Sequence, residues 1–386
     1  MNRTEFITVT AIILFGAFLL WTAYKLAVES FSHSHSTDEE YEPNAVVKWF
    51  QRNVRTTTEF AGGALADEGK LDIVFINDGH VAPYHVAWLS GFEDAIEAYD
   101  DAFEDIEITG RWLSAEGSLE KMIQQTEVTI NEKPDVMFVN AINVDAFEPL
   151  VAKAQEAGIT WIAVHSPMES ADYSFTLGDV ANGTNQGMAM CALSGGEAYK
   201  VAVMLGQAGN PSGEARREGI MKGIASCDNV EVVAEQPADW DTVKAQSIAE
   251  NWMTQYPDLD AISGVTDAYM YPSIAIATNS GKDLEFFGYD GDIPILQQMQ
   301  NGPVKADILL SGTREGWNFV QMAYRIHKGE TPDKVYDFFT PLVMSEESHK
   351  IALENGFPED VQVYYVDQAL DVAAKGFLEF GPDSVK

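Results

Sequence analysis

The stretch LDIVFIND, residues 71–78, followed after a short turn by HVAWLSGFEDAIEAY, residues 85–99, decides the fold of this chain. The first stretch is a short run rich in Val, Ile and Phe, which is typical of a buried strand, and the second has the apolar spacing of an amphipathic helix. The alternation continues with predicted strands at residues 135–141 and 159–166 and predicted helices at 118–132 and 146–158. Strands that alternate with helices predict a parallel sheet.

After residues 173–183 the same alternation starts again. Four more predicted strands, each followed by a helical stretch, are KVAVMLG, NVEVVAEQP, LDAISGV and LEFFGYDG, at residues 200–206, 229–237, 259–265 and 284–291. A chain of 386 residues also exceeds what one hydrophobic core usually organises. We therefore expect an α/β protein with two similar doubly wound parallel-sheet lobes joined by a hinge. The predicted first lobe holds residues 71–178 and about 311–340, and the second holds 179–310 and about 341–386.

The charge of the chain excludes one class of partner. There are 60 acidic and 24 basic residues, which gives a formal net charge of -36. Such a surface repels phosphate backbones, so no nucleic-acid partner is expected. The 46% of hydrophobic residues is enough to build large cores.

The N-terminus predicts the compartment. Residues 6–24, FITVTAIILFGAFLLWTAY, are 19 residues without a charge, about the length that spans a bilayer. We expect residues 1–27 to be a transmembrane anchor or a cleaved signal segment, and either one exports the rest of the chain to the periplasm. Residues 28–70 are expected to form a stalk, because SFSHSHSTDEEYEP is poor in apolar residues.

The ends of the predicted strands locate a candidate site. In open parallel sheets, ligands bind beyond the carboxyl ends of the strands. The side chains at these ends are mostly aromatic or hydrogen-bonding: Asn77, Asp78, Tyr84, His85, Asn140, His165, Ser166, Trp240, Thr266, Asp267 and Asp290.

Five motifs in order resemble the periplasmic sugar-binding proteins of the ribose-binding type. The resemblance covers residues 71–328, about two thirds of the chain, and the motifs are APYHVAWLSGFEDA, EKPDVMFVNAINVDAFEPLVAKAQEAGI, GEARREGIMKGI, PADWDTVKAQSIAENWMTQYPDLDAI and FFGYDG. It implies two hinged lobes that close on a monosaccharide and deliver it to an ABC importer through a permease. No cofactor is implied.

Two aromatic positions match the family pattern. Tyr84 and His85 stand where the family has an aromatic pair, and Trp240 matches the aromatic residue of the family's ADFD segment. A sugar face presents C–H groups, so the resemblance implies that aromatic plates cover the two faces of a ligand. The alternative for Trp240 is that it only caps the interlobe core.

Polar positions match in part. The resemblance implies that Arg216 donates a fork of hydrogen bonds to ligand oxygens, with Arg217 as the alternative, and that Asp290 accepts from two hydroxyls. His165 and Ser166 replace a charged Asp-Arg pair of the family, and Thr266 replaces an Asn. Leu310 stands near the position of a family Gln. These departures change which hydroxyl pattern is satisfied, so a sugar other than ribose, a polyol or another small polar metabolite is expected.

Catalysis is not expected, because no phosphate loop, nucleophile elbow, H-E-x-x-H or C-x-x-C motif occurs. Cys191 and Cys227 fall in consecutive predicted helices, and export leaves open whether they form a disulfide. The main functional hypothesis is the capture protein of an ABC sugar importer. The alternative is a membrane-tethered sensor that signals ligand occupancy to a receptor or kinase.

Overall fold

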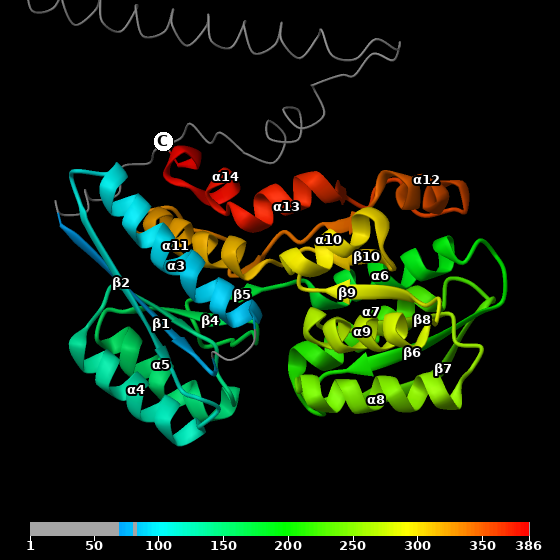
Figure 1. Ribbon diagram of the computed structural model, residues 1–386. Helices are drawn as coiled ribbons and strands as arrows, with labels where there is room; N and C mark the ends of the chain where they lie inside the picture. The colour runs from blue at the N-terminus through cyan, green and yellow to red at the C-terminus, as the bar shows by residue number, and fades with distance from the viewer. Residues whose placement is uncertain (1–68, 80–82, 386) are drawn as a thin grey trace, which may run out of the picture. The chain divides into compact units, whose positions relative to one another are not determined.

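A six-stranded sheet carries the first lobe (Figure 1). In this computed structural model, which describes residues 69–79 and 83–385, the strand order is β11-β5-β4-β3-β1-β2 and all neighbours run parallel. The strands are β1 (Lys70–Asn77), β2 (Glu107–Ser114), β3 (Val136–Val139), β4 (Thr160–Val164), β5 (Tyr173–Thr176) and β11 (Val335–Asp337). The helices are α3 (Pro83–Ala102), α4 (Leu119–Glu132), α5 (Val144–Glu156) and α11 (Gly312–His327).

A seven-stranded sheet carries the second lobe, in the order β13-β12-β10-β9-β8-β6-β7. Only the β10–β12 pair is antiparallel among the described strands. The strands are β6 (Tyr199–Leu205), β7 (Val230–Pro237), β8 (Ala261–Gly264), β9 (Glu285–Tyr289), β10 (Val304–Ile308), β12 (Leu342–Met344) and β13 (Val363–Tyr365). The helices are α6 (Asp179–Leu193), α7 (Pro211–Ile224), α8 (Thr242–Gln255), η1 (Asp267–Tyr269), α9 (Met270–Ser280) and α10 (Ile293–Asn301).

The central strands are apolar on both faces because helices cover both faces of each sheet. In β1 every residue from Ile73 to Ile76 is fully buried. Helices begin where a side chain accepts a hydrogen bond from the first turn, as Ser118 does for α4, Asn143 for α5 and Asp241 for α8. The predicted two-lobed α/β architecture is confirmed.

Both sheets reverse their strand order at one point. In the first lobe the reversal lies between β1 and β3, and in the second between β6 and β8. Loops from neighbouring strands leave in opposite directions at such a point, and ligands bind beyond the strand ends there. The fold therefore provides one such place in each lobe.

The chain crosses between the two sheets three times: β5 is followed by α6, β10 by α11, and β11 by β12. The crossing segments are bonded to one another, since the Leu309 N–H donates to the Pro341 carbonyl at 2.9 Å and the Thr340 hydroxyl donates to the Leu177 carbonyl at 3.4 Å. Three short, adjacent crossings therefore connect the two lobes.

The C-terminal segment contacts both lobes. The helix α13 (Val366–Ala374) packs on α10 of the second lobe, but α14 (Phe377–Phe380) packs on α11 of the first lobe. The Tyr99 hydroxyl of α3 donates to the Phe380 carbonyl at 2.9 Å. The last turns, from Phe377 onward, thus contact the first lobe, whereas the sequence analysis assigned all residues after about 341 to the second. The other elements of this segment are α12 (Glu346–Glu354) and η2 (Pro382–Ser384).

The end of the chain packs on the first lobe beside Arg314 of α11. Arg314 is fully buried, and a buried guanidinium requires a counter-charge. Its Nη1 donates to the carbonyls of Leu309 and Leu310 at 2.9 and 3.0 Å, and its Nη2 donates to the Phe339 carbonyl at 3.2 Å and to Glu379 Oε1 at 3.1 Å. Its Nε also donates to the Glu379 carboxylate. One guanidinium thus joins two hinge crossings to the end of the chain.

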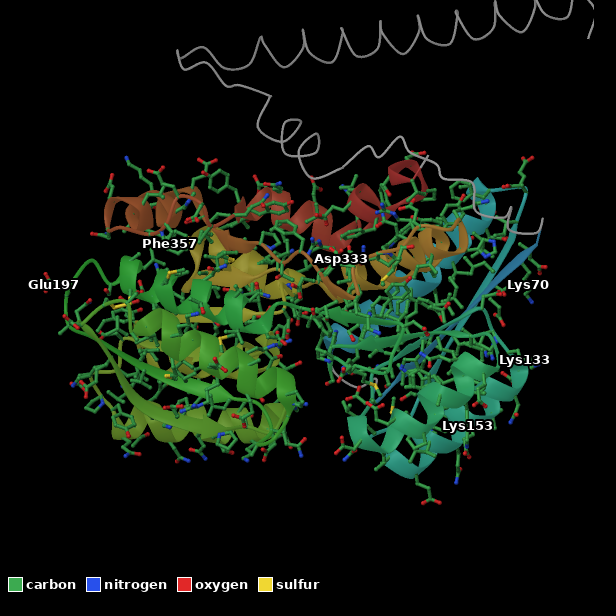
Figure 2. All side chains as sticks on the ribbon, turned by 180° about the vertical axis from the view of Figure 1, so that it is seen from behind. Lys70, Lys133, Lys153, Glu197, Asp333 and Phe357 are labelled. Carbon is green, nitrogen blue, oxygen red and sulfur yellow. A yellow bond between two sulfur atoms is a disulfide. The ribbon has the colours of Figure 1, made fainter. Side chains whose placement is uncertain are left out.

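The outer surface is charged and the second lobe contains a disulfide. Side chains such as Lys133 and Lys153 point outward from the helices of the first lobe (Figure 2). A disulfide joins Cys191 of α6 to Cys227, just after α7. The predicted anchor or signal segment and nearly all of the predicted stalk lie outside the described residues, and no helix in the described part of the chain has the length and apolar character of a membrane span.

Candidate functional site

Polar side chains gather at the carboxyl ends of the first-lobe strands. Asn77 ends β1, and Asn140 follows β3. The Asn140 amide donates to Asn77 Oδ1 at 3.2 Å and to Asp78 Oδ1 at 3.1 Å. These are residues that the strand-end rule selected, and the structure brings them together because their strands are direct neighbours.

The first-lobe half of the site centres on a residue that was not predicted, Glu315. Its carboxylate accepts hydrogen bonds from the Tyr84 hydroxyl and from His165 Nε2, the latter at 2.6 Å. Glu315 is fully buried, and the His165 side chain is 14% exposed. Two predicted site residues from distant parts of the chain are thus held by one carboxylate.

Close contact between α3 and α11 places Tyr84 beside Glu315. A Cβ atom added to Gly312 would lie 2.4 Å from the Tyr84 carbonyl oxygen, and one added to Gly316 would lie 2.4 Å from the backbone of Trp88 and Phe92. Only glycine permits the two backbones to approach this closely. The helix approach therefore sets the position of the Tyr84–Glu315 contact.

His165 lies at the end of β4 in a strained conformation. Its φ is 60°, a left-handed value that non-glycine residues rarely adopt, and its backbone N–H donates to the Phe175 carbonyl at 2.8 Å. The imidazole stacks on the Trp88 ring with centroids 5.0 Å apart. Burial is the largest single influence and lowers the pKa of His165, but the charge and hydrogen bond of Glu315 and the charge of Asp179 together outweigh it, so the pKa lies above the usual 6.5.

His85 lies at the edge of this group. Its ring stacks over Trp88 at 6.1 Å and meets the Tyr84 ring edge-on at 6.0 Å. Its Nε2 is 4.0 Å from Asp78 Oδ1, and its side chain is 26% exposed. The two members of the predicted aromatic pair therefore differ, since Tyr84 binds the buried Glu315 while His85 stays more accessible.

Arg216 is the centre of the second-lobe half. Its Nε donates to Asp179 Oδ1 at 2.9 Å, and its Nη1 donates to the Val265 carbonyl at 2.8 Å and lies 3.5 Å from Asp290 Oδ1. The guanidinium lies over the Tyr289 ring, 4.1 Å from its centroid. The adjacent Arg217 instead pairs with Glu235 on the exposed surface. Arg216 is therefore the arginine that the fold places in the site.

Asp290 and Thr266 are adjacent at the ends of β9 and β8. The Thr266 hydroxyl donates to Asp290 Oδ2 at 2.5 Å, and the Asp267 N–H donates to the same oxygen at 3.2 Å. Burial raises the pKa of Asp290 to about 7, although Arg216 acts in the opposite direction. Both predicted residues are thus in the site, and Thr266 orients the carboxylate.

Buried carboxylates behind Asp290 hold its loop in place. Asp267 accepts hydrogen bonds from the N–H groups of Tyr289 at 3.0 Å and Asp292 at 2.8 Å, and Asp307 accepts one from Gly291 at 3.3 Å. Burial is the main cause that raises the pKa of both Asp267 and Asp307, and the charge of Asp307 raises the pKa of Asp267 further, as the charge of Asp290 does for Asp307. No group of three or more acidic, His or Cys side chains in the described part of the chain is arranged to hold a metal.

Trp240 forms a partly exposed plate beside Arg216. Its φ is 62°, its N–H donates to the Tyr269 hydroxyl at 2.8 Å, and its ring stacks on that of Tyr269 at 6.3 Å. The ring packs so closely on Gly206 that a Cβ atom there would lie 2.5 Å from it. The Arg216 guanidinium is 6.0 Å from the ring centroid. These contacts hold the indole rigidly, as a stacking surface requires.

The two halves act on each other electrostatically. The pKa of Tyr84 is raised by burial and by Glu315, and also by Asp290 from the second lobe, while Arg216 lowers it. Asp179 raises and Arg216 lowers the pKa of His165. Charged groups of the second lobe therefore shift the pKa values of the Tyr84 hydroxyl and the His165 imidazole in the first lobe.

Two acids of the site, Glu315 and Asp179, were missed by the sequence analysis. Asp179 begins α6 in the segment predicted to join the lobes, and the Tyr289 hydroxyl also donates to it at 2.8 Å. Its position at the predicted boundary between the two lobes could have identified it as a candidate. Glu315 has no such signal, because it lies within a helix beyond the last strand that the sequence analysis predicts, at residues 284–291.

Comparison with known proteins identifies the family to which the chain is similar. The model of a family described as "Periplasmic binding protein domain" matches residues 68–331, more than half of the chain. The D-allose-binding periplasmic protein of Escherichia coli is 27% identical over 206 residues, which cover 50% of this chain and 66% of that protein. The xylitol-binding protein of Mycolicibacterium smegmatis is 27% identical over 232 residues, covering 58% and 66%. The chain thus spans just under two thirds of the length of these two relatives.

Solved structures show the same fold. A periplasmic solute-binding protein of an ABC transporter from Actinobacillus succinogenes, with bound D-allose, has a TM-score of 0.65 and 21% identity and covers 72% of this chain and 99% of its own. A solute-binding protein from Bacillus halodurans, with bound myo-inositol, has a TM-score of 0.63 and 21% identity and covers 75% and 100%.

Proposed function

The chain belongs to the periplasmic binding protein domain family, and from this membership we propose that it binds a monosaccharide or polyol and delivers it to an ABC importer. The observation that carries the proposal is the second-lobe group of Arg216, Asp290 and Trp240. Together these residues offer N–H donors, a carboxylate acceptor and an aromatic plate, which is the combination that a ring or chain bearing hydroxyls requires. Relatives named for D-allose and xylitol support this ligand class.

The proposed mechanism is hinge closure. A ligand on the second-lobe group gains the contacts of Tyr84 and His165 only when the lobes approach, so it favours the closed state by its additional affinity for that state. The permease of the importer would then recognise the closed form. Because the relatives are binding proteins by name, we infer binding without catalysis.

We further propose that the body works in the periplasm, attached by residues 6–24 or released after their cleavage. The support is the uncharged stretch of 19 residues in the sequence. Membrane fractionation followed by N-terminal sequencing of the mature protein distinguishes the two fates. Recovery of the protein in the cytoplasmic fraction would contradict both.

Thermal unfolding of the full chain tests the ligand class, with D-allose, D-ribose, xylitol and myo-inositol as probes. A ligand at 100 times its dissociation constant adds about 2.7 kcal/mol to the free energy of unfolding. We expect at least one probe to raise the melting temperature, and Trp240→Ala to remove this response. Trp112→Ala is the control, because the Trp112 indole N–H instead donates to Glu93. A cooperative transition that no probe shifts would contradict the proposed ligand class.

A further inference from the structure

The Glu315 carboxylate is an unusual feature of the first lobe. It is fully buried, and both of its oxygens are used, one by the Tyr84 hydroxyl and the other by His165 Nε2 at 2.6 Å. Burying a carboxylate is costly unless a charge and hydrogen bonds compensate for the lost water. The burial of Glu315 costs free energy, and its carboxylate lies between two candidate site residues, which points to a role other than packing.

The directions of the hydrogen bonds determine what these two residues can offer to a ligand. A carboxylate only accepts, so the Tyr84 O–H and the His165 Nε2–H both point at Glu315. The Tyr84 oxygen then keeps its lone pairs and can accept a hydrogen bond from a ligand hydroxyl. When His165 is protonated, its other ring nitrogen, Nδ1, carries a proton and can donate.

We propose that Glu315 is the positioning residue of the first-lobe half: it fixes Tyr84 as a hydrogen-bond acceptor and His165 as a cationic N–H donor toward the ligand. The part of this proposal that concerns the ligand rests on the proposed sugar or polyol binding. The pair of His165 and Tyr84 thereby supplies one donor and one acceptor where the resembling proteins have a charged Asp-Arg pair and an aromatic pair. Glu315 therefore helps to determine which hydroxyl pattern is bound.

The charges around His165 agree with this assignment. Glu315 of α11 and Asp179 of α6 favour the imidazolium, whereas Arg216 of α7 and burial oppose it, and the net effect raises the pKa of His165. The other titratable groups nearby are Tyr84, whose pKa is well above 10 because of burial and Glu315, and His85, which stacks on the same Trp88 ring. Within residues 69–79 and 83–385, Glu315 is the group hydrogen-bonded to His165 Nε2.

Histidine NMR titration of the full chain without ligand tests the positioning role. We expect the pKa of His165 to be above 6.5 in the wild type and below 6.5 in Glu315→Gln, because burial then acts without the adjacent anion. His327 and His349 are internal controls, since burial is the largest cause that lowers the pKa of each and Glu315 is not among the causes. His165→Gln identifies the resonance.

An unchanged His165 titration in Glu315→Gln would overturn the proposal, whether or not any sugar binds. Unchanged titrations of His327 and His349 show that Glu315→Gln is folded. If that variant does not fold, Tyr84→Phe is a second variant for the same titration. That variant removes only the hydroxyl contact, so it should leave Glu315 paired with His165 and the His165 pKa above 6.5.

Calorimetric binding of D-allose between pH 5.5 and pH 9 tests the role of His165 toward the ligand. The wild type should bind more weakly as the pH rises through the pKa of His165, because the Nδ1 donor is lost. Glu315→Gln should show that loss at a lower pH. Affinity that stays constant in the wild type across the measured His165 titration would overturn the donor role. Failure of D-allose, D-ribose, xylitol and myo-inositol all to bind would refute the proposed function and leave the NMR result to decide on Glu315.

Discussion

Each lobe contains a closely packed helix pair that brings an acid onto the site. In the first lobe α3 and α11 place Glu315 on Tyr84, and in the second α6 and α7 place Asp179 on Arg216. Glycines allow both approaches: a Cβ atom on Gly316 would lie 2.4 Å from backbone atoms of α3, and one on Gly187 would lie 2.4 Å from the Ile220 carbonyl oxygen of α7. The same packing solution thus supports both halves.

The two pairs differ in how they are held. The helices α6 and α7 are separated by a single strand, and the Cys191–Cys227 disulfide joins them. In contrast, 231 residues separate Tyr84 from Glu315, and α11 is held at its start by the buried Arg314–Glu379 ion pair. The second-lobe half keeps the arginine and aspartate that the resemblance implies but has Thr266 in place of an Asn, while the first-lobe half has His165 and Ser166 in place of a charged pair. The two halves of the candidate site therefore differ mainly in how far apart in the sequence their contacting residues lie and in how their helices are held.

Removing the counter-charge of Arg314 should have the largest effect. Glu379→Ala leaves a fully buried guanidinium without its carboxylate, so we expect the free energy of unfolding to fall by about 3 to 5 kcal/mol. Chemical denaturation measures it. Glu330→Ala is the control, because its pair with Arg325 is about half exposed and should contribute less than about 1 kcal/mol. Similar losses in the two variants would show that the ion pair does not hold α11.

Removing the disulfide should have the next largest effect. Replacing both Cys191 and Cys227 with Ala opens a loop with a sequence separation of 36 residues, which should cost about 2 to 4 kcal/mol. Denaturation under oxidising conditions measures the loss, and the reduced wild type should resemble the variant. If the variant is as stable as the oxidised wild type, the disulfide does not distinguish the two helix pairs.

Filling the helix contact in the first lobe should cost about 1 to 3 kcal/mol. In Gly316→Ala the added methyl group meets backbone atoms of Trp88 and Phe92, so α11 must move away from α3. That movement should also lengthen the Tyr84–Glu315 contact and shift the His165 resonance in NMR spectra. Gly79→Ala is the control, because its added methyl group meets nothing within 4 Å. If Gly316→Ala lowers the stability but leaves the His165 signal unchanged, the packing of α11 on α3 does not set the geometry of the Tyr84–Glu315 contact.

The pH dependence of stability should show the smallest effect. The pKa of His165 is raised in the folded state, so the folded protein binds more protons than the unfolded one near that pKa. The stabilisation is therefore complete below about pH 6.5 and is lost as the pH rises through the folded-state pKa. The stability difference between wild type and Glu315→Gln, measured from pH 5.5 to 9, should shrink as the pH rises. The Asp290 carboxyl, with a pKa of about 7, is present in both proteins and largely cancels in this difference. A difference that is constant with pH would refute the contribution of the ion pair.

The sequence alone was sufficient for the architecture and for most of the second-lobe half. Alternating apolar runs predict the two parallel sheets, and strand ends locate His165, Thr266 and Asp290, because a short-range pattern encodes each of these features. The family resemblance then selects Arg216 over its neighbour Arg217, and the structure places Arg216 against Asp179 and Asp290.

Only the tertiary structure decided the contacts between elements that are far apart in the chain. Glu315 meets Tyr84 and His165 only because α11 returns to pack on α3, and Glu379 meets Arg314 only because the end of the chain crosses back to the first lobe. Local periodicity reports which face of a helix is buried, but it does not report which partner lies on that face. The approach of two backbones and the burial of a charge are properties of the assembled core, and in this protein they determine the first-lobe half of the site.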